Sequence, residues 1–208
     1  ANPKAHFQQP VSLEEVLGSR LISDPLRLYD CPPISDGASA AVLCAADLAG
    51  EFTSRPIDVI GSGHAMGPGT LFEMADLTSF EASLSAAREA YRMAGVAPRD
   101  VDVAEVHDCF TIAEIAAIED LGLVAKGEGG RATETGVTAL GGPIPVNPSG
   151  GLLAKGHPVG ATGLAQIYEI VLQLRGEAMN QVAGAQIGLA HNLGGTGATS
   201  TVHILKRR

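Results

Sequence analysis

The apolar positions of this chain change their spacing along the sequence, between the two-residue period of strands and the helical period. Four short segments are continuously apolar or alternating and are typical of strands, while three longer segments carry apolar residues every three to four positions, as helices do. The predicted strands are 57–64, 101–108, 185–192 and 198–205, and the predicted helices are 83–95, 111–123 and 164–174. Strands that alternate with helices favour a layered α/β fold, and the final hairpin-like pair predicts a mixed sheet.

The remaining segments have weaker patterns. Ser12 and Glu15 form a capping-box pair that predicts a short helix near the N-terminus. Residues 37–50, which are small and apolar, are interpreted as a buried strand that runs into a short helix. Residues 126–151 are rich in Gly, Thr and Pro without a clear period, and a loop of that length inside a domain is usually functional.

Composition narrows the class of protein. The formal net charge of −9 argues against a general nucleic-acid-binding protein, because phosphate binding needs clustered Lys and Arg. No apolar run has the length of a membrane span, and the start lacks the pattern of a signal peptide. The three cysteines have no zinc-binding spacing, which favours a reducing, cytoplasmic setting. Because the chain starts without methionine, we expect a fragment or a processed piece.

Histidines lie at three places where strands end or glycines gather. His107 and Cys109 stand between a predicted strand and a helix, His157 lies in "GGLLAKGHPVG", and His191 ends a strand before "LGGTG". A thiol, a base and hydrogen-bond donors suit acyl chemistry on a thioester. The phosphate-loop alternative lacks the Walker spacing, and a metal site of the three histidines lacks supporting carboxylate or thiolate ligands.

Four motifs carry a resemblance to a known family. They are "SDGASAAVL" at 35–43, "HDCF" at 107–110, "GHPVGATG" at 156–163 and "HNLGGTG" at 191–197. In this order they resemble the C-terminal half of the thiolase superfamily, in its sterol-carrier-protein-type and archaeal acetyl-CoA acetyltransferase branch. The resemblance implies a layered α/β/α fold with a mixed five-stranded sheet. It also implies that residues 1–35 end a loop domain or linker and that residues 36–208 form the C-terminal domain.

The resemblance implies roles for the residues of these motifs. His157 is expected to activate the nucleophilic thiol, and Cys109 to be the acid/base cysteine that moves the proton of the acetyl-CoA methyl carbon. His107 stands where other thiolases have an asparagine that holds a water in the first oxyanion hole. No metal and no cofactor are implied, with coenzyme A as part of the substrate. The expected oxyanion and substrate-binding residues are His191, Leu193, Gly194 and Gly156.

The acylated cysteine of thiolases belongs to the N-terminal half, which this sequence does not contain. Cys31, beside two prolines, and Cys44, in an apolar run, are poor replacements. We therefore expect a thiolase-type acyltransferase half that works with an N-terminal half, forms homo-oligomers and is inactive by itself. Two alternatives stay open. One is a retro-aldolase of steroid side-chain CoA esters with a small OB-fold or zinc-ribbon partner, although that group is expected to carry a tyrosine in place of the acid/base residue. The other is a non-catalytic binding or scaffold subunit.

Overall fold

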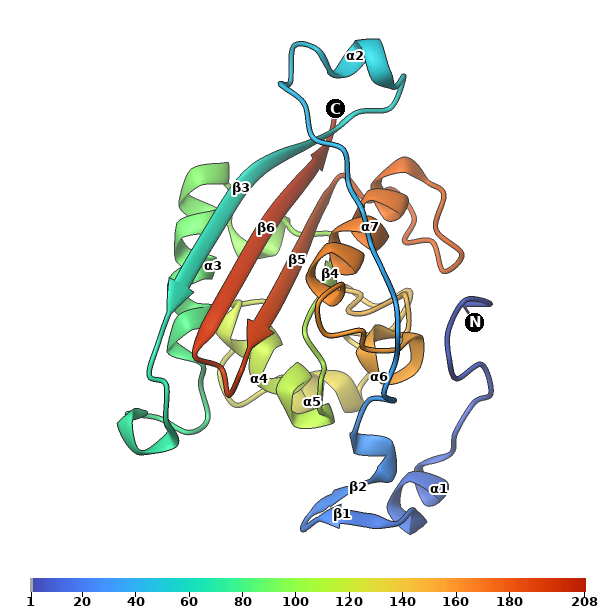
Figure 1. Cartoon of the computed structure of the whole chain (residues 1–208), viewed down its shortest axis with the longest axis vertical. Coiled ribbons are helices and arrows are strands. Elements are labelled where there is room, and N and C mark those ends of the chain that lie inside the picture. The colour runs from blue at the N-terminus through green and yellow to red at the C-terminus, as the bar shows by residue number, and fades with distance from the viewer. Residues whose placement is uncertain (1) are drawn as a thin grey trace.

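The computed structural model describes residues 2–208, and its centre is a mixed sheet in the order β3-β6-β5-β4 (Figure 1). β6 pairs antiparallel with both β3 and β5, whereas β4 pairs parallel with β5. The strands are β3 (Ile57–Met66), β4 (Val103–Glu105), β5 (Ile187–Gly194) and β6 (Thr199–Arg207). The prediction of five strands is wrong for the described residues, which form a 4-stranded main sheet. Val146 continues it only as an isolated bridge to Ala104.

Two long helices cover opposite faces of this sheet (Figure 1). Helix α3 (Glu81–Ala94) packs on β3 and β6 through Ala86 and Ala90, which are fully buried. Helix α7 (Thr162–Arg175) packs on β4 and β5 through Ile170 and Leu174. The predicted helices are therefore confirmed, and so is the layered α/β arrangement. Their apolar faces are predicted only in part, because Leu84, Ile112 and Tyr168 are exposed.

The α3 face is packed unusually closely because glycines line β3. A Cβ atom on Gly63 would lie 1.9 Å from the backbone oxygen of Ala86, and one on Gly61 would lie 2.3 Å from that of Ala90. Neither distance is sterically possible, so only glycine allows this helix backbone to approach the strand.

Short helices gather beyond the carboxyl end of β4. They are α4 (Thr111–Asp120), α5 (Gly129–Glu134) and α6 (Gly151–Lys155). The prediction of an unstructured loop over 126–151 is therefore wrong at α5, which is too short to show a helical period in the sequence. Helix α6 leads directly into Gly156 and His157.

The N-terminal residues form a small separate arrangement beside these helices. The expected capping box is present at α1 (Leu13–Gly18). Ser12 Oγ accepts from the Glu15 backbone N–H at 3.2 Å, and the Glu15 carboxylate accepts from the Ser12 backbone N–H. β1 (Leu21–Ser23) and β2 (Leu26–Arg27) then pair antiparallel. Single-turn 3-10 helices lie at Leu28–Asp30, Leu71–Glu73 and Pro98–Asp100.

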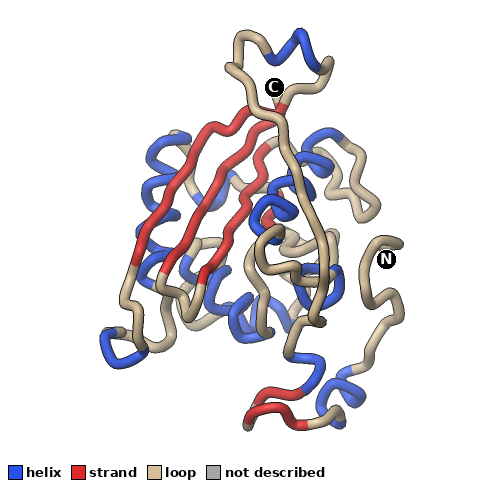
Figure 2. The backbone as a smooth tube through the Cα atoms, viewed as in Figure 1, coloured by secondary structure: helices blue, strands red, loops and turns tan. Residues whose placement is uncertain are grey.

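The buried strand expected within residues 37–50 is a wrong prediction. Residues 35–45 are without a strand assignment and run as an open loop toward α2 (Ala49–Phe52) (Figure 2). Val42 is 91% exposed and Leu43 is 81% exposed, so apolar side chains typical of a strand have no sheet to join among residues 2–208. The short helix that follows is confirmed. Within residues 2–208, no helix combines the length and the apolar character that crossing a membrane requires.

Candidate active site

Hydrogen bonds of Asn147, Glu105 and Glu114 fix the chain where β4 ends and the "HDCF" segment begins. Asn147, whose φ is 50°, accepts from the Val106 backbone N–H at 2.8 Å and donates to Glu114 at 2.7 Å. Glu105, the last residue of β4, accepts from both the backbone N–H and the hydroxyl of Ser149. Burial raises the pKa of Glu105 and of Glu114 to about 7. These bonds join the end of β4 to the segment that precedes α6.

Asp108 joins the "HDCF" segment to α6 itself. Its carboxyl group accepts from the backbone N–H of Leu152 at 2.7 Å and of Leu153 at 3.4 Å, at the start of the helix. A Cβ atom on Gly151, which has a φ of 60°, would lie 2.1 Å from Asp108 Oδ2. The contact needs glycine there, and it fixes α6 against the loop that carries His107 and Cys109.

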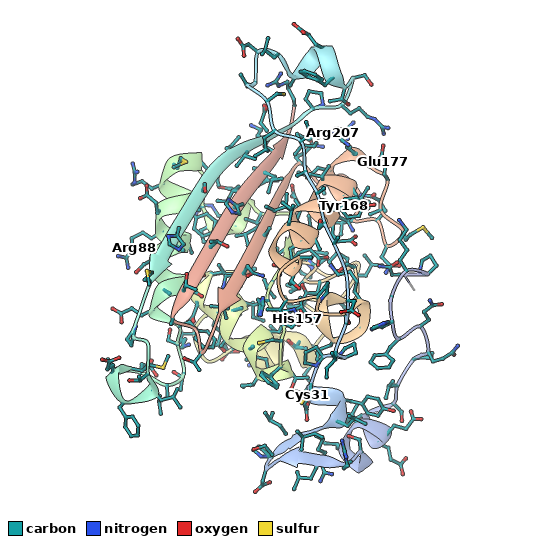
Figure 3. All side chains as sticks on the ribbon, in the orientation of Figure 1. Cys31, Arg88, His157, Tyr168, Glu177 and Arg207 are labelled. Atoms are coloured by element: carbon teal, nitrogen blue, oxygen red, sulfur yellow. The ribbon has the colours of Figure 1, made fainter. Side chains whose placement is uncertain are left out.

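His107 and His157 meet at this place although they are 50 positions apart in the sequence. Their ring centroids lie 5.0 Å apart, and the rings are edge to face at 85°. In Figure 3 His157 lies near the lower ends of the central strands, while Cys31 lies below it toward the β1–β2 unit. The structure thus brings together two of the three residues predicted to be catalytic, and Cys109 is two positions from one of them.

The hydrogen bonds of His157 indicate which ring nitrogen carries its proton. His157 Nδ1 lies 2.7 Å from the hydroxyl of Thr162, and that hydroxyl donates to the carbonyl oxygen of Pro158 at 3.1 Å. The hydroxyl has one proton, so it accepts from an Nδ1–H. The other nitrogen, Nε2, keeps its lone pair and is able to act as a base.

Burial keeps both histidines neutral near pH 7. It lowers the pKa of His107 to about 4, with a smaller contribution from His157, and it also lowers the pKa of His157. The pKa of the half-buried Cys109 thiol is raised by burial and by Asp108. At neutral pH the pair therefore consists of two neutral imidazoles, and the Cys109 thiol on the same loop as His107 is protonated. Such groups are able to take and to give protons.

His191 makes its hydrogen bond to α3 and not to this pair, although His107 also contributes to lowering its pKa. It is fully buried, its Nε2 lies 2.9 Å from the Ser83 hydroxyl of α3, and burial lowers its pKa to about 3. Because side chains alternate along a strand, the next residue, Asn192, faces α7 instead and contacts His107. The motif residue that contacts the histidine pair is thus Asn192, which the sequence interpretation missed although alternation along the predicted strand could have shown it.

Leu193 and Gly194 lie within β5, not in the loop expected after His191. They pair with Ser200 and Thr199 of β6. The glycine-rich turn is shorter than predicted because the strand continues through Gly194. Among residues 2–208, no cluster of three His, Cys, Asp or Glu side chains is arranged to hold a metal ion.

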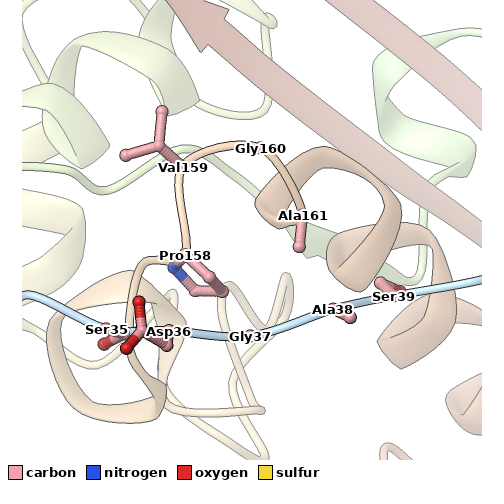
Figure 4. Close-up of a pocket in the computed structure, with 9 residues that line it drawn as sticks. All are labelled: Ser35, Asp36, Gly37, Ala38, Ser39, Pro158, Val159, Gly160 and Ala161. Atoms are coloured by element: carbon pink, nitrogen blue, oxygen red, sulfur yellow. The ribbon is translucent and has the colours of Figure 1, made fainter.

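Gly156 packs against Ser35, which lines a shallow cavity. Its φ is 116°, and a Cβ atom there would lie 2.7 Å from Ser35 Oγ, which accepts from the His157 backbone N–H at 3.2 Å. A cavity of about 440 Å³ opens between residues 35–39 and residues 158–161 (Figure 4). The "SDGAS" and "PVGA" segments, distant in sequence, form its two walls.

Comparison with known proteins agrees with this architecture. The chain is 56% identical over 207 residues to acetyl-CoA acetyltransferase of Methanothermobacter thermautotrophicus, covering 99% of the chain and 54% of that enzyme. It is 43% identical over 203 residues to sterol carrier protein 2 of Oryctolagus cuniculus, covering 95% of the chain and 37% of that protein. The chain spans about half or less of these relatives.

A solved structure and a family match lead to the same assignment. The Ltp2-ChsH2(DUF35) aldolase is similar with a TM-score of 0.87 at 29% identity, covering 99% of this chain and 54% of that one. Residues 63–207 match the family described as thiolase C-terminal domain-like. The chain therefore belongs to the thiolase family, in which residues 63–207 form a C-terminal domain.

Proposed function

We propose that this chain is the C-terminal half of a thiolase-type acyltransferase acting on acyl-CoA or 3-oxoacyl-CoA thioesters, with acetyl-CoA acetyltransferase chemistry. The observation that carries the proposal is the pair formed by His107 and His157, whose rings lie 5.0 Å apart, with Cys109 on the same loop as His107. Thioester condensation needs a base, a proton donor and an oxyanion-stabilising group, and these three residues supply them.

The proposed reaction has two stages. In the first, His157 Nε2 takes the proton of a nucleophilic cysteine, and the resulting thiolate displaces coenzyme A from the acyl-CoA, whose departing thiolate takes the proton from His157. In the second, the Cys109 thiol gives its proton to a neutral histidine of the pair, and the Cys109 thiolate removes a proton from the methyl carbon of acetyl-CoA. The carbanion attacks the carbonyl carbon of the acyl-cysteine and expels the cysteine thiolate, which takes the proton back from the histidine. In thiolysis the Cys109 thiol returns a proton to the departing carbanion, and the raised pKa of this thiol keeps that proton available. His107 stabilises the developing oxyanion by donating a hydrogen bond.

The nucleophilic cysteine comes from an N-terminal half in this proposal. Cys31 lies toward the β1–β2 unit (Figure 3). Cys44 lies on the exposed 35–45 segment, so neither cysteine replaces the nucleophile. The apolar side chains of Ile34, Val42 and Val159 are at least 81% exposed and would be covered by such a partner or in a homo-oligomer. Acyl-CoA would enter along the cavity between residues 35–39 and 158–161.

The cysteines also support a cellular location for the proposed enzyme. Cys31, Cys44 and Cys109 are free thiols. A cytoplasmic, reducing location would keep them so.

A second candidate is the aldolase reaction, favoured by the likeness to the Ltp2-ChsH2(DUF35) aldolase. It would use the same histidine pair to cleave a carbon–carbon bond in a hydroxyacyl-CoA ester, together with a small partner protein. The presence of Cys109 as an acid/base group favours the thiolase reaction over this one.

The test is thiolysis and condensation by the complete enzyme, with the nucleophilic cysteine present. We expect Cys109→Ala and His157→Ala each to lower kcat by about 10²–10⁴-fold, the usual contribution of a general acid or base. Cys31→Ala is the matched control and should keep the activity of the unmodified enzyme. Full activity of both site variants would refute the roles assigned here, and cleavage of a hydroxyacyl-CoA ester without thiolysis would favour the aldolase.

A further inference from the structure

The amide of Asn192 contacts two partners with the same nitrogen. Its Nδ2 lies 2.9 Å from His107 Nδ1 and donates to Gln166 Oε1 at 2.8 Å. Gln166, on α7, is fully buried; its Oε1 is the acceptor that orients this amide, while its Nε2 has no hydrogen-bond partner in the part of the chain that the structure describes. An amide nitrogen donates and does not accept hydrogen bonds, so in this orientation of the Asn192 amide His107 Nδ1 is the acceptor.

We propose that Asn192 is a positioning residue that holds neutral His107 in the form protonated at Nε2. With Nδ1 occupied as an acceptor, the single proton of the neutral ring lies on the other nitrogen. His107 is thereby a hydrogen-bond donor through Nε2. This inference rests on the proposed function for its catalytic meaning, since a donor is what an oxyanion requires.

The neighbouring histidine is held in the opposite form. Thr162 accepts from His157 Nδ1–H, which leaves the lone pair on Nε2, whereas Asn192 donates to His107 Nδ1. The two rings, 5.0 Å apart, therefore differ at Nε2: this nitrogen is a proton acceptor on His157 and a hydrogen-bond donor on His107. Without Asn192, nothing among the contacts of His107 would distinguish its two neutral forms, and the ring could present a lone pair to an oxyanion.

The experiment reads the protonated nitrogen directly. The complete enzyme is labelled with ¹⁵N-histidine, His107 is assigned by comparison with His107→Gln, and two-bond ¹H–¹⁵N correlation spectra are recorded near pH 7. We expect Nε2 to be protonated in the unmodified enzyme. In Asn192→Asp the carboxylate accepts, so the proton should move to Nδ1. The pKa of His107 should rise beside the new charge, which adds an inflection to the pH profile of kcat.

Activity provides the second measurement. We expect Asn192→Asp to lower kcat by about 10–100-fold with little change in KM, the size typical of lost orientation by a neighbouring residue. Asn180→Asp adds the same charge beside the Pro148 carbonyl, where the side chain has no hydrogen bond to either histidine, and it should leave the His107 spectrum unchanged.

Each outcome decides the inference. A His107 protonated at Nδ1 in the unmodified enzyme would overturn it, as would an Asn192→Asp enzyme with an unchanged spectrum and rate. If Asn192→Asp does not fold, judged by thermal denaturation, the spectrum of the unmodified enzyme still decides. If the enzyme lacks acyl transfer altogether, the proposed function fails while the spectrum still tests the position of the proton.

Discussion

The two faces of β5 carry consecutive residues with different surroundings. On the α3 face, His191 is enclosed completely and contacts Ser83, which in turn lies 3.3 Å from Ser200. On the α7 face, Asn192 contacts His107, whose ring meets His157. The contacts of His191 stay within the core between β5, β6 and α3. Those of Asn192 link β5 to α7 and to the loops that carry His107 and His157.

The difference shows that a perturbed titratable group does not by itself mark a functional site. Burial lowers the pKa of both His107 and His191, to about 4 and about 3. The ring of His107 contacts that of His157 and His107 shares its loop with Cys109, whereas the hydrogen bond of His191 is to Ser83. The arrangement of neighbouring groups, more than the size of the shift, separates a candidate catalytic residue from a structural one.

The largest effect that would sharpen this comparison is expected at His107. In the complete enzyme, His107→Ala should lower kcat by about 10²–10³-fold, the usual loss when one oxyanion donor is removed. His107→Asn should recover much of this rate because its amide also donates a hydrogen bond. Arg88→Ala, on the outer side of α3, is the control and should match the unmodified enzyme in a thiolysis assay (Figure 3). Equal rates for the alanine and asparagine variants would contradict a donor role.

On the α3 face the largest expected effect is on stability. Gly63→Ala would bring a Cβ atom to 1.9 Å from the Ala86 carbonyl oxygen, so α3 must move away from β3. We expect the free energy of unfolding to fall by about 3 kcal/mol, at the upper end for overpacking. Urea denaturation measures this loss. Gly69→Ala, where the added atom meets nothing within 4 Å, should change stability by about 0.5 kcal/mol or less. A tolerated Gly63→Ala would show that the two layers are loosely packed.

A smaller and pH-dependent effect is expected at His191. The folded pKa of about 3 lies below the ordinary value of 6.5, so between these pH values the unfolded chain binds a proton that the folded chain does not. The contribution of neutral His191 to the free energy of unfolding is therefore complete above pH 6.5. It is lost as pH falls below this value, by up to about 1.4 kcal/mol per pH unit. His191→Leu removes this titration and costs about 1 kcal/mol at pH 7.5 through the lost Ser83 bond.

The measurement is urea denaturation of the unmodified enzyme and of His191→Leu at several pH values. The leucine variant should be less stable at pH 7.5 and more stable at pH 4.5. Parallel stability curves across this range would mean that His191 is not buried as described. A large loss of kcat at unchanged stability would mean that the α3 face takes part in the reaction.

Local sequence patterns predicted most of the fold, and they failed where the structure of a segment depends on pairing with another segment. The period of α3 and α7 and the alternation of β5 and β6 required no information beyond their own residues. Residues 37–45 have the composition of a strand, but a strand exists only when another backbone pairs with it, and no backbone within residues 2–208 does so. The six-residue helix α5 was missed because fewer than two helical turns show no clear period.

The site shows the same limit at the level of side chains. His107 and His157 were identified because their motifs are distinctive, yet their mutual approach depends on bonds from Asp108 to α6 that no spacing reveals. His191 was grouped with them because it shares their motif order. Its true neighbours follow from the face of β5 on which it lies, which requires the position of the sheet between two helices.

The alternation along β5 also restricts how this protein can change in evolution. Deletion or insertion of one residue between Ile187 and Asn192 would exchange the faces of every later residue in the strand. Asn192 would then enter the alanine-rich layer under α3, and its contact with His107 would be lost. We expect related sequences to differ in this strand by substitution at constant length, and to vary in length instead at open segments such as residues 67–70.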